Sequence, residues 1–311
     1  MMFHPILRDK PALLEQGIKI IDNDEEGEFD IAFISARGYL DDFNKTIKKF
    51  KLEKKPIVIM DSQDSPRLAS FHLTERDNVV GFVKKQVYKD REVYKHIHSN
   101  PRYHFSDNPS KNFKINKKFK GDLNKLYLGW NLGMANRFHV FRGKIPIRKK
   151  TLDVHYSGSI WNNLQEYQQH RKRCRDEIIK ATRKNNWSFS GHCSGKKYKE
   201  KMKIAKVGIS PWGLGEICFR NFEMIKEGVI VIAPKTNHLE TWPDIYQDGI
   251  NYISCSSNFS DIEDKIKMIL NKYSDFKPVA ENAFNLMNVC WKTESVISQF
   301  MKILNGVRKR I

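Results

Sequence analysis

The sequence predicts an α/β protein with two lobes, each built around a parallel β-sheet. Two observations lead to this prediction. In both halves of the chain, short and continuously apolar segments alternate with amphipathic ones, as buried parallel strands alternate with the helices that cover them. The length of 311 residues is also enough for two units that each have a core. We expect an N-terminal lobe over residues 1–150 and a C-terminal lobe over residues 151–311.

The N-terminal half contains a strand–helix–strand pattern. Leu40, Phe43 and Ile47 recur at helical spacing between two apolar segments. A polar loop over residues 62–70 follows the second apolar segment, at the sheet edge where α/β proteins usually bind ligands. A basic, proline-containing linker is expected over residues 142–150. The expected elements are strands over residues 17–21, 30–35, 56–61 and 127–131, and a helix over residues 39–51.

The C-terminal half repeats the alternation. Its last stretch, residues 279–307, has a helical pattern with a break near residues 289–292. The expected strands cover residues 152–156, 187–190, 207–210, 229–233 and 251–254. The expected helices cover residues 163–183, 198–206, 216–227 and 261–273.

The composition is that of a globular chain, with 40% hydrophobic and 12% aromatic residues. The five cysteines have no paired spacing, which indicates reduced thiols and a cytoplasmic protein without structural zinc. No secretory signal is visible at the N-terminus. No apolar segment approaches the roughly 20 residues of a membrane span. We therefore expect any membrane contact to be peripheral.

The net charge of +19 favours a polyanion, an anionic lipid surface or a phosphorylated small molecule as partner. A lysine-rich solvated surface without a partner accounts for the charge equally well. The basic run over residues 111–120 has the same two interpretations, a solvated face or a surface for docking an acceptor or a membrane. The charge is the single feature that favours a nucleic-acid-binding protein. The sequence marks of a zinc finger or an RNP motif are missing.

Residues 210–228 carry the strongest functional signal. Gly213 and Gly215 precede an expected helix, and glycines there let free backbone N–H groups approach an anion. On a helical wheel, Glu216, Arg220 and Glu223 share one side, opposite an apolar side. An ordinary amphipathic helix with an exposed charged stripe accounts for the same spacing. The glycines and the apolar strand that follows favour a ligand site.

This segment resembles the donor-binding element of group 1 GT-B glycosyltransferases, and in particular the CgeB-like or exostosin-like branch with its G-x-G-E-x-x-x-R-x-x-E pattern. The pattern runs from Gly213 to Glu223. The resemblance covers about residues 152–305, through Pro234, Lys235 and His238. It implies a GT-B-like fold of two Rossmann-like lobes facing a cleft, with the last helix crossing back to the first lobe.

The resemblance also implies roles for individual residues. Glu223 would bind the donor ribose with its carboxylate. Arg220 would hold the diphosphate and stabilise the leaving group. Glu216 lies seven positions before Glu223, whereas group 1 retaining enzymes have two glutamates eight positions apart, so the stereochemical outcome stays open. The implied donor-binding residues are Ser157, Ser159, Gly213, Leu214, Gly215, Glu216, Arg220, Glu223 and Lys235.

Candidates for catalysis lie in both halves. Asp61 and Asp64 follow an expected strand and are candidates for the base that deprotonates an acceptor hydroxyl, although turn-capping aspartates are common at such positions. His238 is a third candidate because its neighbours match the family. Since GT-B enzymes stabilise the leaving diphosphate with basic groups and helix ends, we expect no metal ion and no cofactor beyond the nucleotide-sugar donor.

The sequence thus predicts a glycosyltransferase that moves a sugar from a nucleotide-sugar to a hydroxyl group of a glycan, lipid or protein. It is expected to be cytoplasmic, with its basic surface as a peripheral membrane contact. Two alternatives stay open: a basic nucleic-acid-binding protein, and a sugar-nucleotide binder without catalytic activity.

Overall fold

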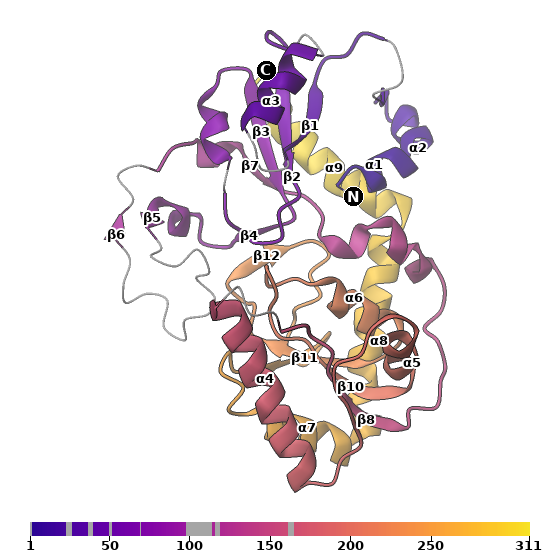
Figure 1. Ribbon diagram of the computed structural model, residues 1–311. Coiled ribbons are helices and arrows are strands. Elements are labelled where there is room, and N and C mark those ends of the chain that lie inside the picture. The colour runs from indigo at the N-terminus through magenta and orange to yellow at the C-terminus, as the bar shows by residue number, and fades with distance from the viewer. Residues whose placement is uncertain are drawn as a thin grey trace.

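The computed structural model describes residues 2–22, 27–36, 40–49, 52–68, 70–97, 114–115, 119–160 and 165–311. The chain forms two α/β lobes that lie end to end, the N-lobe in indigo and purple and the C-lobe in red to yellow (Figure 1). Each lobe contains a parallel sheet, as the sequence predicts.

Parallel strands form the N-lobe sheet. In the described residues it has four strands, in the order β1 (Ala32–Ala36), β2 (Ile57–Asp61), β3 (Val79–Lys84) and β7 (Leu126–Leu128). Every residue of β2 and β3 is buried, which explains their continuous apolar sequences. The expected strands near residues 30–35, 56–61 and 127–131 are confirmed, while β3 is an additional central strand.

The C-lobe sheet has a doubly wound order. In the described residues its strands are ordered β13 (Ile253–Cys255), β11 (Ile230–Pro234), β10 (Ala205–Ile209), β8 (Leu152–His155) and β9 (Phe189–Ser190), all parallel. Along the chain this is the order 2-1-3-4-5, which reverses direction between β8 and β10. Ligands of such sheets bind at this switch point, beyond the carboxyl ends of the strands.

Helices surround both sheets. The α-helices are α1 (His4–Arg8), α2 (Lys10–Glu15), α3 (Leu40–Lys49), α4 (Gln165–Lys184), α5 (Gly195–Ile204), α6 (Phe219–Lys226), α7 (Ile262–Asn271), α8 (Tyr273–Cys290) and α9 (Thr293–Arg308). In the described residues the 3-10 helices are η1 (Phe71–Glu75), η2 (Arg91–Lys95), η5 (Leu123–Lys125), η6 (Leu132–Met134) and η7 (Asn136–Arg142). The two-residue strands β5 (His96–Ile97) and β6 (Lys114–Ile115) pair antiparallel. No helix in the described ranges is long and apolar enough to cross a membrane.

A two-stranded antiparallel sheet joins the two lobes. It pairs β4 (Gln86–Tyr88) of the N-lobe with β12 (Leu239–Thr241) of the C-lobe. Asn131 adds side-chain hydrogen bonds to this contact between the lobes. Its Nδ2 donates to Thr241 Oγ1 at 2.9 Å and to the Pro243 carbonyl at 2.8 Å. Backbone hydrogen bonds therefore hold the loop after β11 against the N-lobe.

The last helix also contacts the N-lobe. Helix α9 packs against α1, α2 and β3, and Gln299 Nε2 donates to the Leu128 carbonyl at 2.9 Å. One apolar cluster includes Met60 of β2, Phe222 of α6 and Phe300 of α9. The lobes consequently share a continuous core, in addition to a separate cluster on the far side of each sheet.

One strand predicted from the sequence is wrong. Residues 17–21 form no strand in the described structure, because Gly17 has a φ of 75° and ends α2. The Ile18 N–H then donates to the Leu13 carbonyl at 2.9 Å. Ile18 and Ile20 pack against the shared core from an irregular segment, so their apolar character reflects burial rather than strand pairing.

Candidate active site at the lobe junction

Arg220 lies at the switch point of the C-lobe sheet. It is buried on α6, and its Nη1 donates to the Ser157 carbonyl beyond β8 at 2.6 Å. Its Nη2 donates to the Pro211 carbonyl beyond β10 at 3.0 Å, and its Nε to Ser210 Oγ at 3.3 Å. The guanidinium therefore connects the two loops that flank the switch point, and none of these three acceptors is a carboxylate.

Helix α6 begins at Phe219, three residues after the position expected from the sequence. Cys218, with φ −111° and ψ 154°, is the extended residue that precedes the helix. Glu216 therefore lies in the loop and does not share a helix face with Arg220 and Glu223, contrary to the sequence prediction. A turn in which the Gly213 N–H donates to the Gly215 carbonyl at 2.9 Å keeps residues 213–216 out of the helix.

The glycine loop packs directly on the N-lobe. A Cβ atom at Gly215 would lie 1.8 Å from the Asp64 carbonyl oxygen, so this contact requires glycine. At Gly213, a Cβ would lie 2.8 Å from Cys218 Sγ and 3.1 Å from Arg171 Nη2. Close packing across the lobe junction thus accounts for one glycine of the motif, and packing within the C-lobe accounts for the other.

Glu216 is the deepest carboxylate of the junction. Its side chain has no exposed surface, and its Oε2 accepts a hydrogen bond of 3.1 Å from Gln86 Nε2 of the N-lobe. Its Oε1 lies 3.6 Å from His238 Nε2, on the loop after β11. The junction therefore assembles a carboxylate, an imidazole and an amide from three separate segments of the chain.

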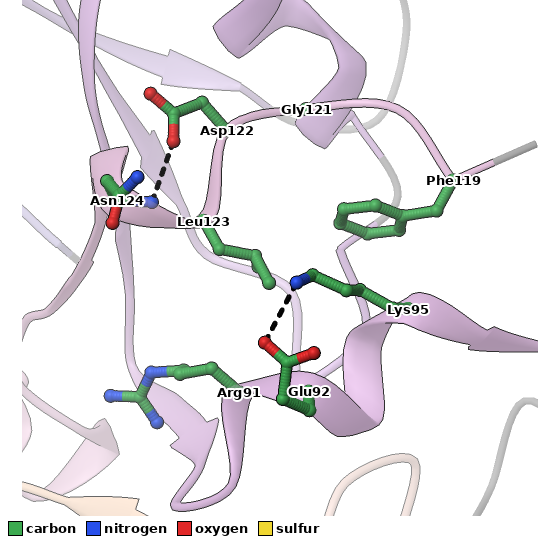
Figure 2. A pocket seen from close by; sticks show the side chains of 8 residues that line it. All are labelled: Arg91, Glu92, Lys95, Phe119, Gly121, Asp122, Leu123 and Asn124. Atoms are coloured by element: carbon green, nitrogen blue, oxygen red, sulfur yellow. Dashed lines mark hydrogen bonds and ion pairs between the residues drawn. The ribbon is translucent and has the colours of Figure 1, made fainter. Parts of the chain in front are cut away.

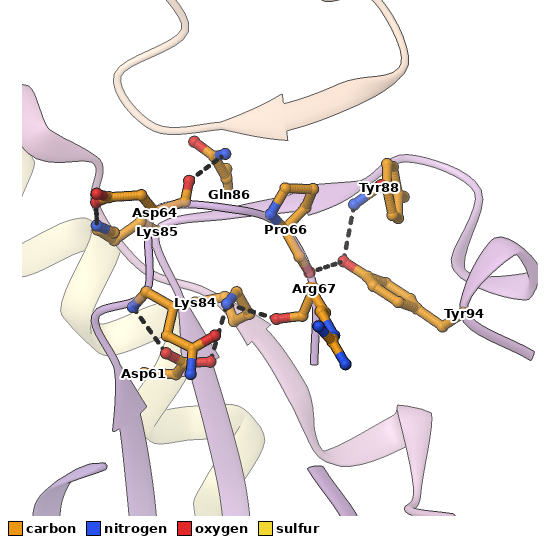
Figure 3. A network of polar contacts seen from close by, with 10 residues as sticks. Asp61, Asp64, Pro66, Arg67, Lys84, Lys85, Gln86, Tyr88 and Tyr94 are labelled. Carbon is orange, nitrogen blue, oxygen red and sulfur yellow. Dashed lines mark hydrogen bonds and ion pairs between the residues drawn. The ribbon is translucent and has the colours of Figure 1, made fainter. Parts of the chain in front are cut away.

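The N-lobe side of the junction contains two lysine–aspartate pairs (Figure 3). Lys84 is completely buried, and its Nζ donates to Asp61 Oδ2 and to the Arg67 carbonyl, both at 2.8 Å. Burial lowers the pKa of Lys84, and the negative charge of Asp61 opposes this shift. Asp61 Oδ1 accepts from the Gln63 N–H at 2.8 Å. Both oxygens of this predicted base are thus bound within the N-lobe.

Asp64, the other predicted base, is half exposed. Its Oδ1 accepts from Lys85 Nζ at 2.7 Å, and its carbonyl accepts from Gln86 Nε2 at 2.9 Å. The same amide nitrogen of Gln86 also bonds Glu216. Gln86 therefore ties the Asp64 loop to the Glu216 loop across the two lobes.

Glu223 lies away from Glu216, on the side of α6 that faces α5. Its Oε2 accepts from the Tyr198 hydroxyl at 2.8 Å, and its Oε1 forms an ion pair with Arg137 of η7. The Glu223 side chain is 21% exposed. Glu223, which the sequence predicts to bind the donor ribose, thus has two protein partners that nothing in the sequence pattern indicated.

The remaining predicted donor-site residues have different surroundings. Ser157 Oγ donates to the Cys193 carbonyl at 2.8 Å, and the Ser159 carbonyl accepts from Arg171 Nη1 at 3.0 Å. Leu214 and Lys235 are exposed. All four residues follow strands β8, β10 and β11 at the carboxyl edge of the sheet. The two serines are bonded to neighbouring segments of the C-lobe, whereas Leu214 and Lys235 extend to the surface.

His155, the last residue of β8, is a buried histidine that the sequence analysis did not identify. The centroid of its ring lies 5.6 Å from the centroid of the Tyr198 ring. Burial, followed by the nearby charges of Arg220 and Lys201, lowers the pKa of His155 to about 4. Its imidazole is therefore neutral at physiological pH.

We expect His155 to make the protein sensitive to acid. Because its pKa is lower in the folded state than the usual 6.5, its contribution to stability is fully present above pH 6.5 and is lost as the pH falls toward 4. Between pH 7.5 and pH 5 this loss amounts to about 2 kcal/mol. Chemical unfolding at the two pH values should show that His155→Phe removes this loss. His192→Gln, at an exposed histidine, should retain it; an unchanged loss in His155→Phe would contradict the assignment.

A cavity of about 400 Å³ lies elsewhere on the N-lobe, between η2 and η5 (Figure 2). Arg91, Lys95, Glu92 and Asp122 line it, so its two cations are matched by two carboxylates. Because carboxylates match its cations, this cavity offers an anion no site comparable with the one beside Arg220. The basic run over residues 111–120 lies nearby in sequence, and most of it falls outside the described residues.

The described residues contain no group of three or more histidine, cysteine, aspartate or glutamate side chains that could hold a metal ion. The sequence has one Asp-x-Asp triplet, at residues 22–24. This is the type of motif with which GT-A enzymes bind a metal, but residues 23 and 24 lie outside the described ranges.

Comparison by sequence gives no match to a protein-family model or to a curated protein. Comparison by structure gives matches. TarM has a TM-score of 0.50 and 12% identity, over 88% of this chain and 54% of TarM. A point mutant of S. aureus TarM, in complex with fondaparinux, α-GlcNAc-glycerol and UDP, has the same TM-score and identity over 84% of this chain and 54% of its own.

Anabaena HepE in complex with UDP aligns over 88% of this chain and 79% of HepE, with 11% identity and a TM-score of 0.48. The chain spans about half the length of TarM. At such low identity the likeness concerns the fold alone, and the match to TarM confirms the two-lobe, GT-B-like α/β architecture expected from the sequence.

Proposed function

We propose that this protein is a glycosyltransferase that moves a sugar from a nucleotide-sugar donor to an acceptor hydroxyl at the lobe junction. The observation that carries this proposal is the position of Arg220. A buried guanidinium lies at the switch point of a doubly wound sheet, with hydrogen bonds to three neutral oxygens. Ligands of such folds bind there.

The chemistry of Arg220 favours a diphosphate. A buried charge is costly unless an opposite charge compensates it. Guanidinium has five N–H donors in a planar fork that suits phosphate oxygens, and the three hydrogen bonds described leave two donors for a ligand. A nucleoside diphosphate would supply the anion, and Arg220 would stabilise its charge as it leaves the sugar.

His238 and Glu216 fit the acceptor half of the reaction. In our proposal the acceptor oxygen attacks C1 of the sugar, the bond from C1 to the diphosphate breaks, and the hydroxyl proton passes to His238. In the proposed tautomer the ring proton is on Nε2, which lies 3.6 Å from Glu216 Oε1. Nδ1 is then the unprotonated nitrogen that accepts the hydroxyl proton. Glu216 would orient the ring, and Gln86 would hold Glu216.

The family resemblance supplies the other parts of the proposal. From it we retain Glu223 as the ribose ligand, Lys235 as a phosphate contact, a metal-independent reaction and a glycan, lipid or protein acceptor. The likeness to TarM, which was solved with UDP, agrees with a nucleotide-sugar donor. A cytoplasmic location likewise stays a proposal from the cysteine usage.

The test is a screen of UDP-, GDP-, ADP- and CMP-sugars by thermal shift and nucleotide release. We expect one donor to stabilise the protein and to release its nucleotide slowly in water and faster with a hydroxyl acceptor. Stabilisation without release, even with acceptors, would identify a sugar-nucleotide binder. Failure of every donor, together with salt-sensitive nucleic-acid binding, would replace the proposal with the nucleic-acid alternative.

Glu216→Gln should lower kcat by about 10²-fold while changing donor affinity little, because the amide keeps the shape but no longer orients His238 as a proton acceptor. Steady-state kinetics and donor titration separate the two quantities. Glu240→Gln, two residues beyond His238 and paired with Arg91 at 2.6 Å, is the matched control. A large loss of donor affinity at unchanged kcat would instead make Glu216 a donor ligand, as the sequence predicted.

A further inference from the structure

Residues 143–150 cross the surface of the C-lobe between η7 and β8, and they connect to the ends of two helices. Lys150 Nζ donates to the Lys203 carbonyl of α5 at 3.0 Å and to the Glu227 carbonyl after α6 at 2.6 Å. The Thr151 N–H donates to the Ile204 carbonyl at 2.9 Å. The segment is thereby fixed beside α5, and Lys150 compensates the partial negative charge of both helix C-termini.

The same segment exposes an isoleucine completely. Ile147 is 100% exposed, whereas Ile145, two residues earlier, packs against the shared core. Lys144 and Lys149 are exposed on either side of Ile147, and Arg148 next to it lies 3.5 Å from Glu227. A single exposed isoleucine is ordinary on a protein surface, but here it stands among cations on a segment that Lys150 holds in place at its C-terminal end.

Helix α5 extends this basic surface. Tyr198 and Met202 face the protein interior, as shown by the Tyr198 bond to Glu223 and the burial of Met202. The outward side carries Lys196, Lys197 and Lys199, all exposed. One acidic side chain on the helix, Glu200, offsets part of this charge through Lys196 at 3.9 Å.

We propose that Lys144, Ile147, Lys149 and the exposed lysines of α5, together called the linker surface, dock the C-lobe on an anionic lipid bilayer. Lipid phosphates attract the cations, and the headgroup boundary takes up an apolar side chain presented between them. A nucleic acid would use only the cations and would leave Ile147 in water. This combination is why we favour a bilayer over another polyanion. The docking does not depend on the glycosyltransferase proposal.

Sedimentation with lipid vesicles tests the linker surface. The protein should bind vesicles of mixed phosphatidylcholine and phosphatidylglycerol but not of phosphatidylcholine alone. Lys144→Gln/Lys149→Gln should weaken binding by about 25-fold, since each cation near the surface contributes about fivefold. Ile147→Ser should weaken it by about tenfold through the lost apolar contact. Circular dichroism should show that both variants are folded.

The control removes the same charge from the opposite side of the C-lobe. Lys180 and Arg183 are exposed on α4, which lies across the lobe from α5 and residues 143–150 (Figure 1). Lys180→Gln/Arg183→Gln should bind vesicles nearly as well as the unmodified protein. An equal loss in this control, or unchanged binding by Ile147→Ser, would overturn the proposal. So would a protein that binds duplex DNA but not the mixed vesicles.

Discussion

Replacing Asp61 with asparagine should lower the free energy of unfolding by about 3–5 kcal/mol, the usual cost of removing one partner of a buried ion pair. Lys84 has no exposed surface, and its charge is compensated by Asp61 Oδ2 at 2.8 Å. Asparagine has the same shape but no charge, so the lysine must either lose its proton or remain charged in a buried position. Chemical denaturation followed by circular dichroism measures the change.

The double variant Asp61→Asn/Lys84→Met is the control for Asp61. Removing both charges should recover most of the lost stability, because apolar replacements of buried ion pairs are often neutral. Asp61 was also a candidate base on sequence grounds. If Asp61→Asn were as stable as the unmodified protein but inactive, Asp61 would be the base and not a structural partner of Lys84.

Replacing Arg220 with methionine should reduce sugar transfer by about 10²- to 10³-fold, the effect of removing a group that stabilises charge on the leaving group. It should also weaken binding of the donor, because Arg220 is a buried cation at the switch point, between Ser157 and Pro211. Initial rates of nucleotide release and calorimetric titration of the donor measure the two effects.

A structural role for Arg220 gives a different pattern. Arg220→Lys keeps the charge but loses the planar fork, so it should bind the donor with intermediate affinity. If Arg220 only connected the two loops, both variants would lose thermal stability and the folded fraction would bind the donor normally. That result would contradict a role in diphosphate binding.

Much of the fold follows from the sequence because buried parallel strands have a visible pattern. The apolar runs of β2 and β11 are short, rich in valine and isoleucine and buried at every position, as strands covered on both faces must be. Strand β3 escaped prediction although its sequence is similarly apolar, with Gly81 in its middle. Residues 17–21 show the opposite error, a predicted strand that the structure does not form. There a glycine with positive φ turns the chain, and the apolar residues pack against the core without pairing with another strand.

The candidate site was less predictable, because tertiary contacts assemble it. Helical spacing placed Glu216 with Arg220, but the turn at Gly213 separates them. Gln86 lies 130 positions from Glu216, and its hydrogen bond to that residue depends on how the lobes meet. Tyr198, the partner of Glu223, likewise belongs to no motif. The glycine loop and Arg220 were recognisable since their spacing is local.

The most direct test of the account is a calorimetric comparison of nucleoside diphosphate and nucleoside monophosphate binding, with the base taken from the best donor in the screen. If Arg220 binds the diphosphate, the diphosphate should bind at least about 10²-fold more tightly, in line with charge-assisted hydrogen bonds to a desolvated cation. Equal affinity for the two nucleotides, or no binding of either by the folded protein, would contradict the proposed donor site.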